Sequence, residues 1–163
     1  MAYGSASIDT FNTSTGQVFS PASGSATMKN RIINGAMTID QRNAGAQTTP
    51  TTGGYFTLDR FFFSIGQSSK FTAQQNAGSV TPPVGFKNYL GITSTSAYTL
   101  VSGDYFAVGQ NIEGYNIADL AWGTANAKTV TLSFQVYSSL TGTFGGALQN
   151  SGSARSYPFS YTI

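Results

Sequence analysis

Strict alternation of apolar and polar side chains, repeated in short runs, is the feature that most limits what this chain of 163 residues can fold into. The clearest run covers residues 128 to 138, in which every second position is apolar: Val130, Leu132, Phe134 and Val136. Because successive side chains of a strand point to opposite faces, this run predicts a strand with one dry and one wet face. We therefore expect Phe134→Ala to cost about 3 to 5 kcal/mol as a core truncation.

Shorter runs of the same kind recur along the chain between Gly-rich and Pro-rich turns. They predict further strands at residues 60–65, 70–75, 89–94, 105–112, 143–150 and 157–163. Pro82-Pro83 lacks two backbone donors, which predicts a loop there. A helix is indicated only from Asn116 to Gly123, by an Asn N-cap and a terminal Gly. The pattern as a whole predicts an all-β, antiparallel β-sandwich with one small helix.

Composition excludes several classes of function. The chain has no Cys and no His, so Ser-His-Asp catalysis, Cys nucleophiles and thiolate metal sites are ruled out. Its eight basic residues are scattered singly, whereas a nucleic-acid partner requires clustered Lys and Arg. No apolar run is long enough for membrane insertion, and the first residues lack the basic and apolar regions of a signal peptide.

Charged residues, rare elsewhere, are concentrated around residues 29 to 60. Asn34-Gly35 predicts one turn and Asn43-Ala44-Gly45 another, with a short strand between them. Four charged side chains in this region could form an ion-pair network that joins the short strand to the strand beginning at residue 59: Asp40, Arg42, Asp59 and Arg60. The alternative is exposed pairs worth roughly 0 to 1 kcal/mol.

Several runs of unusual wording resemble a family of phage virion proteins, tail-fibre or other structural proteins common in cyanophage-like genomes. These runs are NRIINGAMTIDQRNAGA, LDRFFF, AYTLVSGDYFAVGQNIEGYNIADLAWGTA and the stretch from VTLSFQVYSS to the final SYTI. The likeness spans roughly residues 29 to 163. This chain has Phe61 where members usually have Trp after the Asp-Arg pair, and members continue beyond the point where it stops.

The resemblance implies a carbohydrate-binding-module-like jelly roll at residues 29–163, preceded by an extended N-terminal arm at residues 1–28. It implies a non-enzymatic virion structural protein, a fibre or fibre-like appendage assembled in the host cytoplasm. The expected partners are other virion proteins and further copies of the chain in a homotrimer. The arm is too poor in apolar residues to fold alone, and its docking candidates are Tyr3, Ile8, Phe11, Val18 and Phe19. The last strand stops in mid-alternation at Ile163, which indicates missing chain or a partner strand.

Two alternative functions remain open. A receptor-recognition module would bind a host surface glycan by placing an aromatic ring under a pyranose with polar groups around it. The candidates for such a site are Tyr98, Tyr105, Tyr115, Trp122, Gln110 and Glu113, with Tyr55, Asn111 and Asn116 as further members. A polysaccharide depolymerase would need two carboxylates at a set separation, for which Asp104, Glu113 and Asp119 are closest in sequence. No cofactor is expected, although a structural Ca²⁺ would suit such carboxylates.

Overall fold

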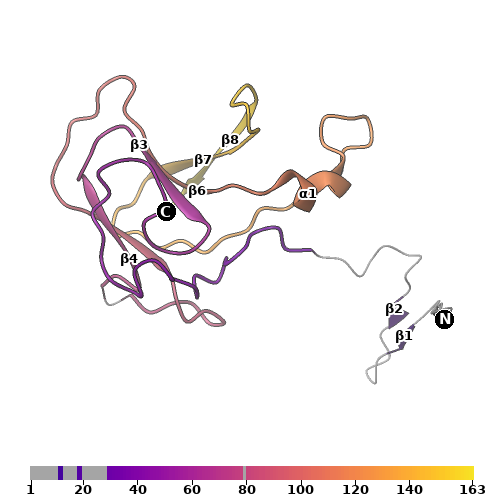
Figure 1. The fold of residues 1–163 in the computed structure, drawn as a ribbon, viewed down its shortest axis with the longest axis horizontal. Helices are drawn as coiled ribbons and strands as arrows, with labels where there is room; N and C mark the ends of the chain where they lie inside the picture. The colour runs from indigo at the N-terminus through magenta and orange to yellow at the C-terminus, as the bar shows by residue number, and fades with distance from the viewer. Residues whose placement is uncertain (1–10, 13–17, 20–28, 79) are drawn as a thin grey trace, which may run out of the picture. The chain divides into compact units, whose positions relative to one another are not determined.

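The computed structural model describes residues 11–12, 18–19, 29–78 and 80–163. The chain divides into two compact units, Met1–Ala127 and Lys128–Ile163, which are described separately below. Strands dominate the described residues and are accompanied by one short helix with a 3-10 turn, which confirms the predicted all-β class (Figure 1). All pairings between strands are antiparallel. The closed sandwich and its jelly-roll topology stay predictions, as does a boundary near residue 28.

The first strand pair lies within the predicted N-terminal arm. β1 (Phe11–Asn12) pairs with β2 (Val18–Phe19), with Phe11 opposite Phe19. Three of the predicted docking residues therefore belong to a short antiparallel pair of strands. Tyr3 and Ile8 lie outside the described residues.

The core of unit Met1–Ala127 is built by two further strand pairs. β3 (Phe61–Ile65) pairs with β6 (Phe106–Gln110), and β4 (Phe71–Gln75) pairs with β5 (Leu90–Ser94). Each strand lies within a run predicted from alternation. The side chains that face inward from β3 and β4 form one buried cluster: Phe63, Ile65, Phe71 and Ala73.

Aromatic rings join the two strand pairs. The Phe71 ring lies 5.4 Å from that of Phe63 and 6.3 Å from that of Phe106, measured between centroids. Phe62, on the other face of β3, meets Tyr55 edge to face at 5.9 Å. Aromatic contacts therefore cover both faces of β3.

The loop before β3 covers the second edges of two strands. Thr48 forms a bridge with Ala73 of β4, and Gly54 forms one with Phe63 of β3. Each bridge is closed by two backbone hydrogen bonds of 2.8 to 2.9 Å. β3 and β4 therefore have a hydrogen-bonded neighbour on each side, which satisfies backbone groups that burial would otherwise leave unpaired. In β5, Gly91 allows a close approach, since a Cβ there would lie 2.4 Å from that of Ala77.

The predicted strand between the turns at residues 34 and 43 is wrong. Residues 37 to 40 run between two turns without joining a sheet. The turns themselves are present: Asn34, Ala44 and Gly45 have positive φ values of 57°, 47° and 82°. The segment is held by side chains instead of a ladder, because Asn34 bonds the backbone of Thr38, Ile39 and Asp59.

The helix begins earlier than its sequence pattern predicts. α1 (Gly114–Ile117) continues directly into the 3-10 helix η2 (Ala118–Leu120). Its N-cap residue is Glu113, not Asn116, and no side chain caps it by a hydrogen bond. The end is close to the prediction, since Ala121 and Gly123 both have positive φ. Leu120 is buried and anchors this turn. No helix in the described ranges is both long and apolar enough to cross a bilayer.

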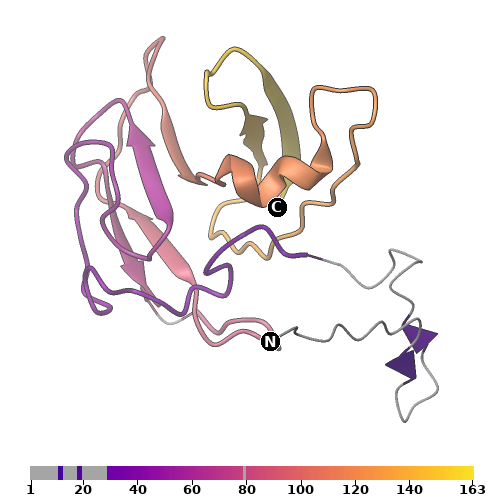
Figure 2. The ribbon, with the colours of Figure 1, turned by 45° about the vertical axis from the view of Figure 1, so that its right-hand side comes forward.

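Unit Lys128–Ile163 consists of one hairpin and one extended segment. β7 (Thr143–Gln149) pairs with β8 (Ser156–Thr162) along its whole length (Figure 2). The predicted strand at 128–138 is wrong, because these residues join no ladder. Phe134 is 48% exposed, so this unit by itself does not bury it in a core as expected. The alternation shows which side chains share a face of the extended segment. It does not show whether the backbone has a hydrogen-bonding partner.

Candidate functional sites

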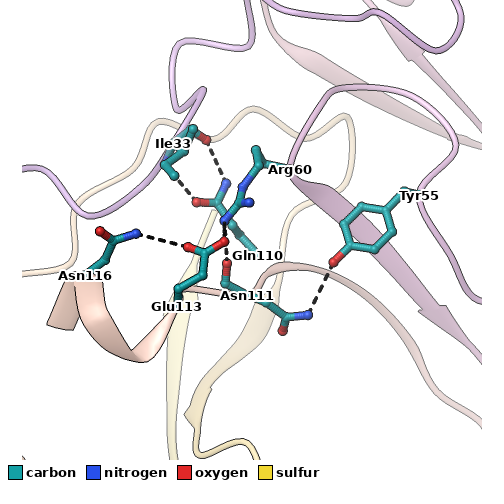
Figure 3. A network of polar contacts seen from close by, with 7 residues as sticks. All are labelled: Ile33, Tyr55, Arg60, Gln110, Asn111, Glu113 and Asn116. Atoms are coloured by element: carbon teal, nitrogen blue, oxygen red, sulfur yellow. Dashed lines mark hydrogen bonds and ion pairs between the residues drawn. The ribbon is translucent and has the colours of Figure 1, made fainter. Parts of the chain in front are cut away.

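A polar cavity of about 200 Å³ lies in unit Met1–Ala127, where the loop before β3 meets the segment after β6. Its lining combines two guanidinium groups, a phenol, an amide and a carboxylate: Arg42, Tyr55, Arg60, Asn111 and Glu113. Four of these residues appear in Figure 3, where Arg60 and Glu113 point toward each other and Tyr55 points toward Asn111. The Tyr55 hydroxyl accepts a hydrogen bond of 3.3 Å from the Asn111 amide.

Arg60 is held at one wall of the cavity. Its Nη2 donates to Glu113 Oε1 at 2.5 Å and to the Asn111 carbonyl at 3.2 Å. Its Nε is buried, with no hydrogen-bond partner among the described residues. The residue also has a φ of 78°, a left-handed conformation that non-glycine residues seldom adopt. Such backbone strain persists only where the surroundings impose it.

Glu113 remains a carboxylate in this setting. The hydrogen bond from Arg60 is the largest cause that holds the pKa of its carboxyl below the ordinary value. Asn116 adds a hydrogen bond of 3.1 Å to the other oxygen. Glu113 therefore offers acceptor oxygens to a ligand and is poorly suited to donate a proton as a general acid at neutral pH.

Arg42 also lines the cavity. Its guanidinium carbon lies 5.6 Å from the centroid of the Tyr55 ring, a cation–π contact. The ion-pair network expected among Asp40, Arg42, Asp59 and Arg60 is wrong. In the described part of the chain the ion pairs are Arg31 with Asp119 and Arg60 with Glu113.

The two aspartates of that expected network accept hydrogen bonds from turn backbone. Asp40 accepts from the backbone of Asn43 and Gly45 at 3.0 and 2.8 Å. Asp59 accepts from the backbone of Gln41 at 3.2 Å. Backbone donors, within five residues for Asp40 and eighteen residues away for Asp59, satisfy these carboxylates, and Arg60 pairs with Glu113 instead.

The predicted glycan residues are not gathered at one place. Tyr98 donates a hydrogen bond of 2.8 Å to Asp104, and Lys70 Nζ lies 4.5 Å from its ring centroid. Gln110 bonds both backbone groups of Ile33, at 2.8 and 2.7 Å (Figure 3). Tyr115 on α1 is 97% exposed, and Tyr105 and Trp122 are about half exposed. Of the six, Glu113 alone lines the cavity.

Arg42 and Arg60 were not among the predicted ligand-binding residues, although the sequence singles out their region. Their charges are crowded into a stretch of an otherwise charge-poor chain, and that crowding was interpreted as mutual pairing. Tyr55 and Asn111, further members of the predicted glycan set, do lie at the cavity. The crowded charges therefore lie next to the site, while the pairing of Arg60 depends on contacts more than fifty residues away.

The three carboxylates considered for hydrolysis are each engaged separately. The pKa of Asp104 is lowered by hydrogen bonds from the Val101 backbone, Gln67 and Tyr98. The pKa of Asp119 is lowered chiefly by its hydrogen bond with Arg31, whose nitrogens lie 2.8 and 2.6 Å away. A general acid for glycoside hydrolysis needs a raised pKa, and these groups show the opposite. Among the described residues, no three acidic side chains lie close enough together to hold a metal ion.

An apolar groove of about 310 Å³ lies within unit Lys128–Ile163. We call it the hairpin groove. Its lining contains no charged side chain: Val130, Leu132, Phe134, Leu148, Tyr157, Phe159 and Tyr161. The Phe134 ring lies 5.1 Å from that of Tyr161 and 6.4 Å from that of Phe159. The extended segment is thus held against β8 by rings, while the groove between them stays open.

Comparison with known proteins yields no relative. No family model, no curated protein and no solved structure matches this chain.

Proposed function

We propose that this chain is a structural subunit of a phage virion, a fibre or fibre-like appendage that acts by adhesion and assembly and not by catalysis. The resemblance of residues 29 to 163 to virion proteins motivates the class of protein. The observation that carries the proposal is that unit Lys128–Ile163 by itself buries none of its residues. An isolated two-stranded hairpin is marginal in water at best. This unit therefore needs a partner surface.

Further copies of the chain are suitable partners for the hairpin groove. Lys128 and Arg155 are the charged residues of the unit, and neither lines the groove. Copies that meet groove to groove oppose no like charges, whereas burial of unpaired charge would oppose association. Half-exposed Leu132 and Phe134 supply apolar area of the kind found at the centre of homomeric interfaces. Fibres are usually threefold, so we propose a homotrimer around this face.

The mass of the full-length chain in solution tests this proposal. Light scattering after gel filtration is expected to give three times the chain mass of 17.1 kDa. Leu132→Lys places a charge in the groove and is expected to reduce the mass to that of one chain. Ser133→Lys is the matched control, because it adds the same charge one residue away at a position that does not line the groove. A monomer at every concentration, or equal loss in both variants, would contradict it.

A second candidate function is recognition of a glycan by the cavity of unit Met1–Ala127. The observation that favours it is the meeting of an aromatic ring, an amide and a carboxylate at Tyr55, Asn111 and Glu113. Ligand sites usually combine a concave surface with a few convergent polar groups of this kind. The ligand class that these groups would select, and its test, follow in the next subsection.

A further inference from the structure

The two arginines of the cavity differ in what they have available for a ligand. Arg60 is committed to Glu113 and to the Asn111 carbonyl. Arg42 lies over the Tyr55 ring and forms no ion pair within the described residues. A cation–π contact occupies no hydrogen-bond acceptor, so the guanidinium N–H groups keep their capacity to donate to a ligand. Those donors form a planar fork that matches a carboxylate.

The position of Arg42 over the ring also limits how a sugar could bind to Tyr55. Arg42 lies over one face of the ring, and Phe62 meets the ring edge to face. A pyranose stacked on Tyr55 would have to compete with Arg42 for that face. The phenol is thus better described as a support that orients Arg42. The ligand would be selected by the polar groups of Arg42, Asn111 and Glu113.

Two other lining residues, Asn111 and Glu113, suit hydroxyl groups. Glu113 accepts one hydrogen bond at each carboxylate oxygen, from Arg60 and from Asn116, and each oxygen has a further lone pair. The Asn111 amide donates to Tyr55, and its side-chain oxygen has no recorded partner within the described residues. These acceptors would receive hydrogen bonds from two or three hydroxyls of a ligand.

Charge and size narrow the ligand further. Two arginines and one glutamate give the lining a net charge of one positive unit. A phosphate carries more negative charge than a carboxylate and would be repelled more strongly by Glu113, while a neutral sugar would leave the Arg42 donors unused. The volume of about 200 Å³ lies below the roughly 300 Å³ at which pockets for drug-sized ligands begin. The cavity therefore suits a single ring with one carboxylate.

We propose that this cavity binds one uronic-acid residue of a glycan, with its carboxylate on Arg42 and its ring hydroxyls on Asn111 and Glu113. The inference rests on the second candidate function, glycan recognition, and is independent of the assembly proposed for unit Lys128–Ile163. The glycan that the chain would bind is therefore an acidic polysaccharide and not a neutral one.

A titration of the full-length chain with two probes tests the inference. The probes are methyl glucuronoside and methyl glucoside, and binding is followed by NMR shifts of the backbone amides near residues 42, 55 and 111. The two probes differ in whether the ring carries a carboxylate. We expect the uronoside to bind about tenfold or more tightly than the glucoside, the size of a charge-assisted hydrogen bond. Arg42→Gln is expected to remove this preference, and Arg155→Gln, in the other unit, is the matched control.

Each outcome is decisive. Equal binding of both probes, or a preference that survives Arg42→Gln, overturns the uronic-acid inference while glycan recognition stands. Failure of both probes to bind at millimolar concentration overturns the inference and glycan recognition together. Arg42→Lys adds a check that folding is intact, since it retains the charge and is expected to keep part of the preference. The solution mass reports on assembly alone and is expected to be unchanged by all three substitutions.

Discussion

Asn34 organises the segment that the sequence marks as unusual. Its Nδ2 donates to the carbonyls of Ile39 and Asp59 at 2.9 and 3.0 Å. Its Oδ1 accepts from the backbone of Thr38 and Ile39 at 3.0 Å. Together with a backbone hydrogen bond of 3.0 Å from Asp59 to the Ile39 carbonyl, this amide holds residues 37 to 40 without a sheet ladder and ties them to the residues just before β3.

Asn34→Ala is expected to destabilise the protein by about 1 to 3 kcal/mol, because it leaves several backbone groups without their partner. Alanine is also less tolerant of the positive φ at this position. Urea unfolding followed by circular dichroism measures the change. Asn30→Ala is the matched control, since its side chain accepts one hydrogen bond, from the Ile32 backbone. A loss of unfolding free energy no greater than that of the control would contradict a stabilising role for the Asn34 hydrogen bonds.

At the scale of single residues, the sequence predicted conformation better than pairing. Asn34-Gly35 and Asn43-Ala44-Gly45 form the expected turns, because positive φ is a local property of these residue types. The partners of Arg31 and Arg60 lie 88 and 53 positions away, in and just before the helical turns. Local sequence does not encode such distances, so the expected ion-pair network placed four charges together wrongly.

At the scale of elements, the helical turn is anchored by charge and not by a cap. Arg31 donates to both oxygens of Asp119 in η2 and to the backbone carbonyl of Asn116 in α1. Arg60 bonds Glu113 just before α1. A helix of this length has too few internal bonds to persist alone. Two arginines from the region before and at the start of β3 therefore fix its position.

This anchoring predicts a loss of stability in acid. The pKa of the Asp119 carboxyl is lowered in the folded protein, chiefly by its hydrogen bond with Arg31. Its contribution is therefore fully present above the ordinary pKa near 3.8 and is lost as the pH falls through the lower folded value. The free energy of unfolding, measured by urea titration across this range, should fall accordingly.

Asp119→Asn should reduce the fall in unfolding free energy that occurs as the pH is lowered. The difference in unfolding free energy between the natural chain and the variant is expected to be largest above pH about 4 and to close below it. A difference that stays constant over the whole acid range would contradict the account. In that case the Arg31 contact would stabilise the helical turn by packing and not by charge.

Alternation located the elements that have a partner within the chain. β3, β4, β5, β6, β7 and β8 all lie within or next to the predicted runs, because each has an antiparallel neighbour in this structure. The strongest run, residues 128 to 138, has no such neighbour and is not a strand. Pattern predicts which side chains share a face, while a ladder also needs backbone partners that no single run can specify.

At the scale of the whole molecule, burial is distributed unevenly between the two units. The residues of the buried core, among them Phe63 at 1% exposure, all belong to unit Met1–Ala127. Unit Lys128–Ile163 keeps its apolar side chains exposed around the hairpin groove. The all-β class was predictable from composition and alternation. This division was not, because no single run of sequence reveals whether its apolar face is covered within the chain.

The central claim is that other copies of the chain cover the hairpin groove. Because the chain has no cysteine, a single introduced thiol reports the exposure of one chosen position. The most direct measurement is the alkylation rate of Leu132→Cys in the native assembly, compared with that of Ser133→Cys. The account predicts slow alkylation at position 132 that becomes fast on dilution to single chains, with fast alkylation at position 133 throughout. Equal, fast alkylation at both positions in concentrated protein would contradict it.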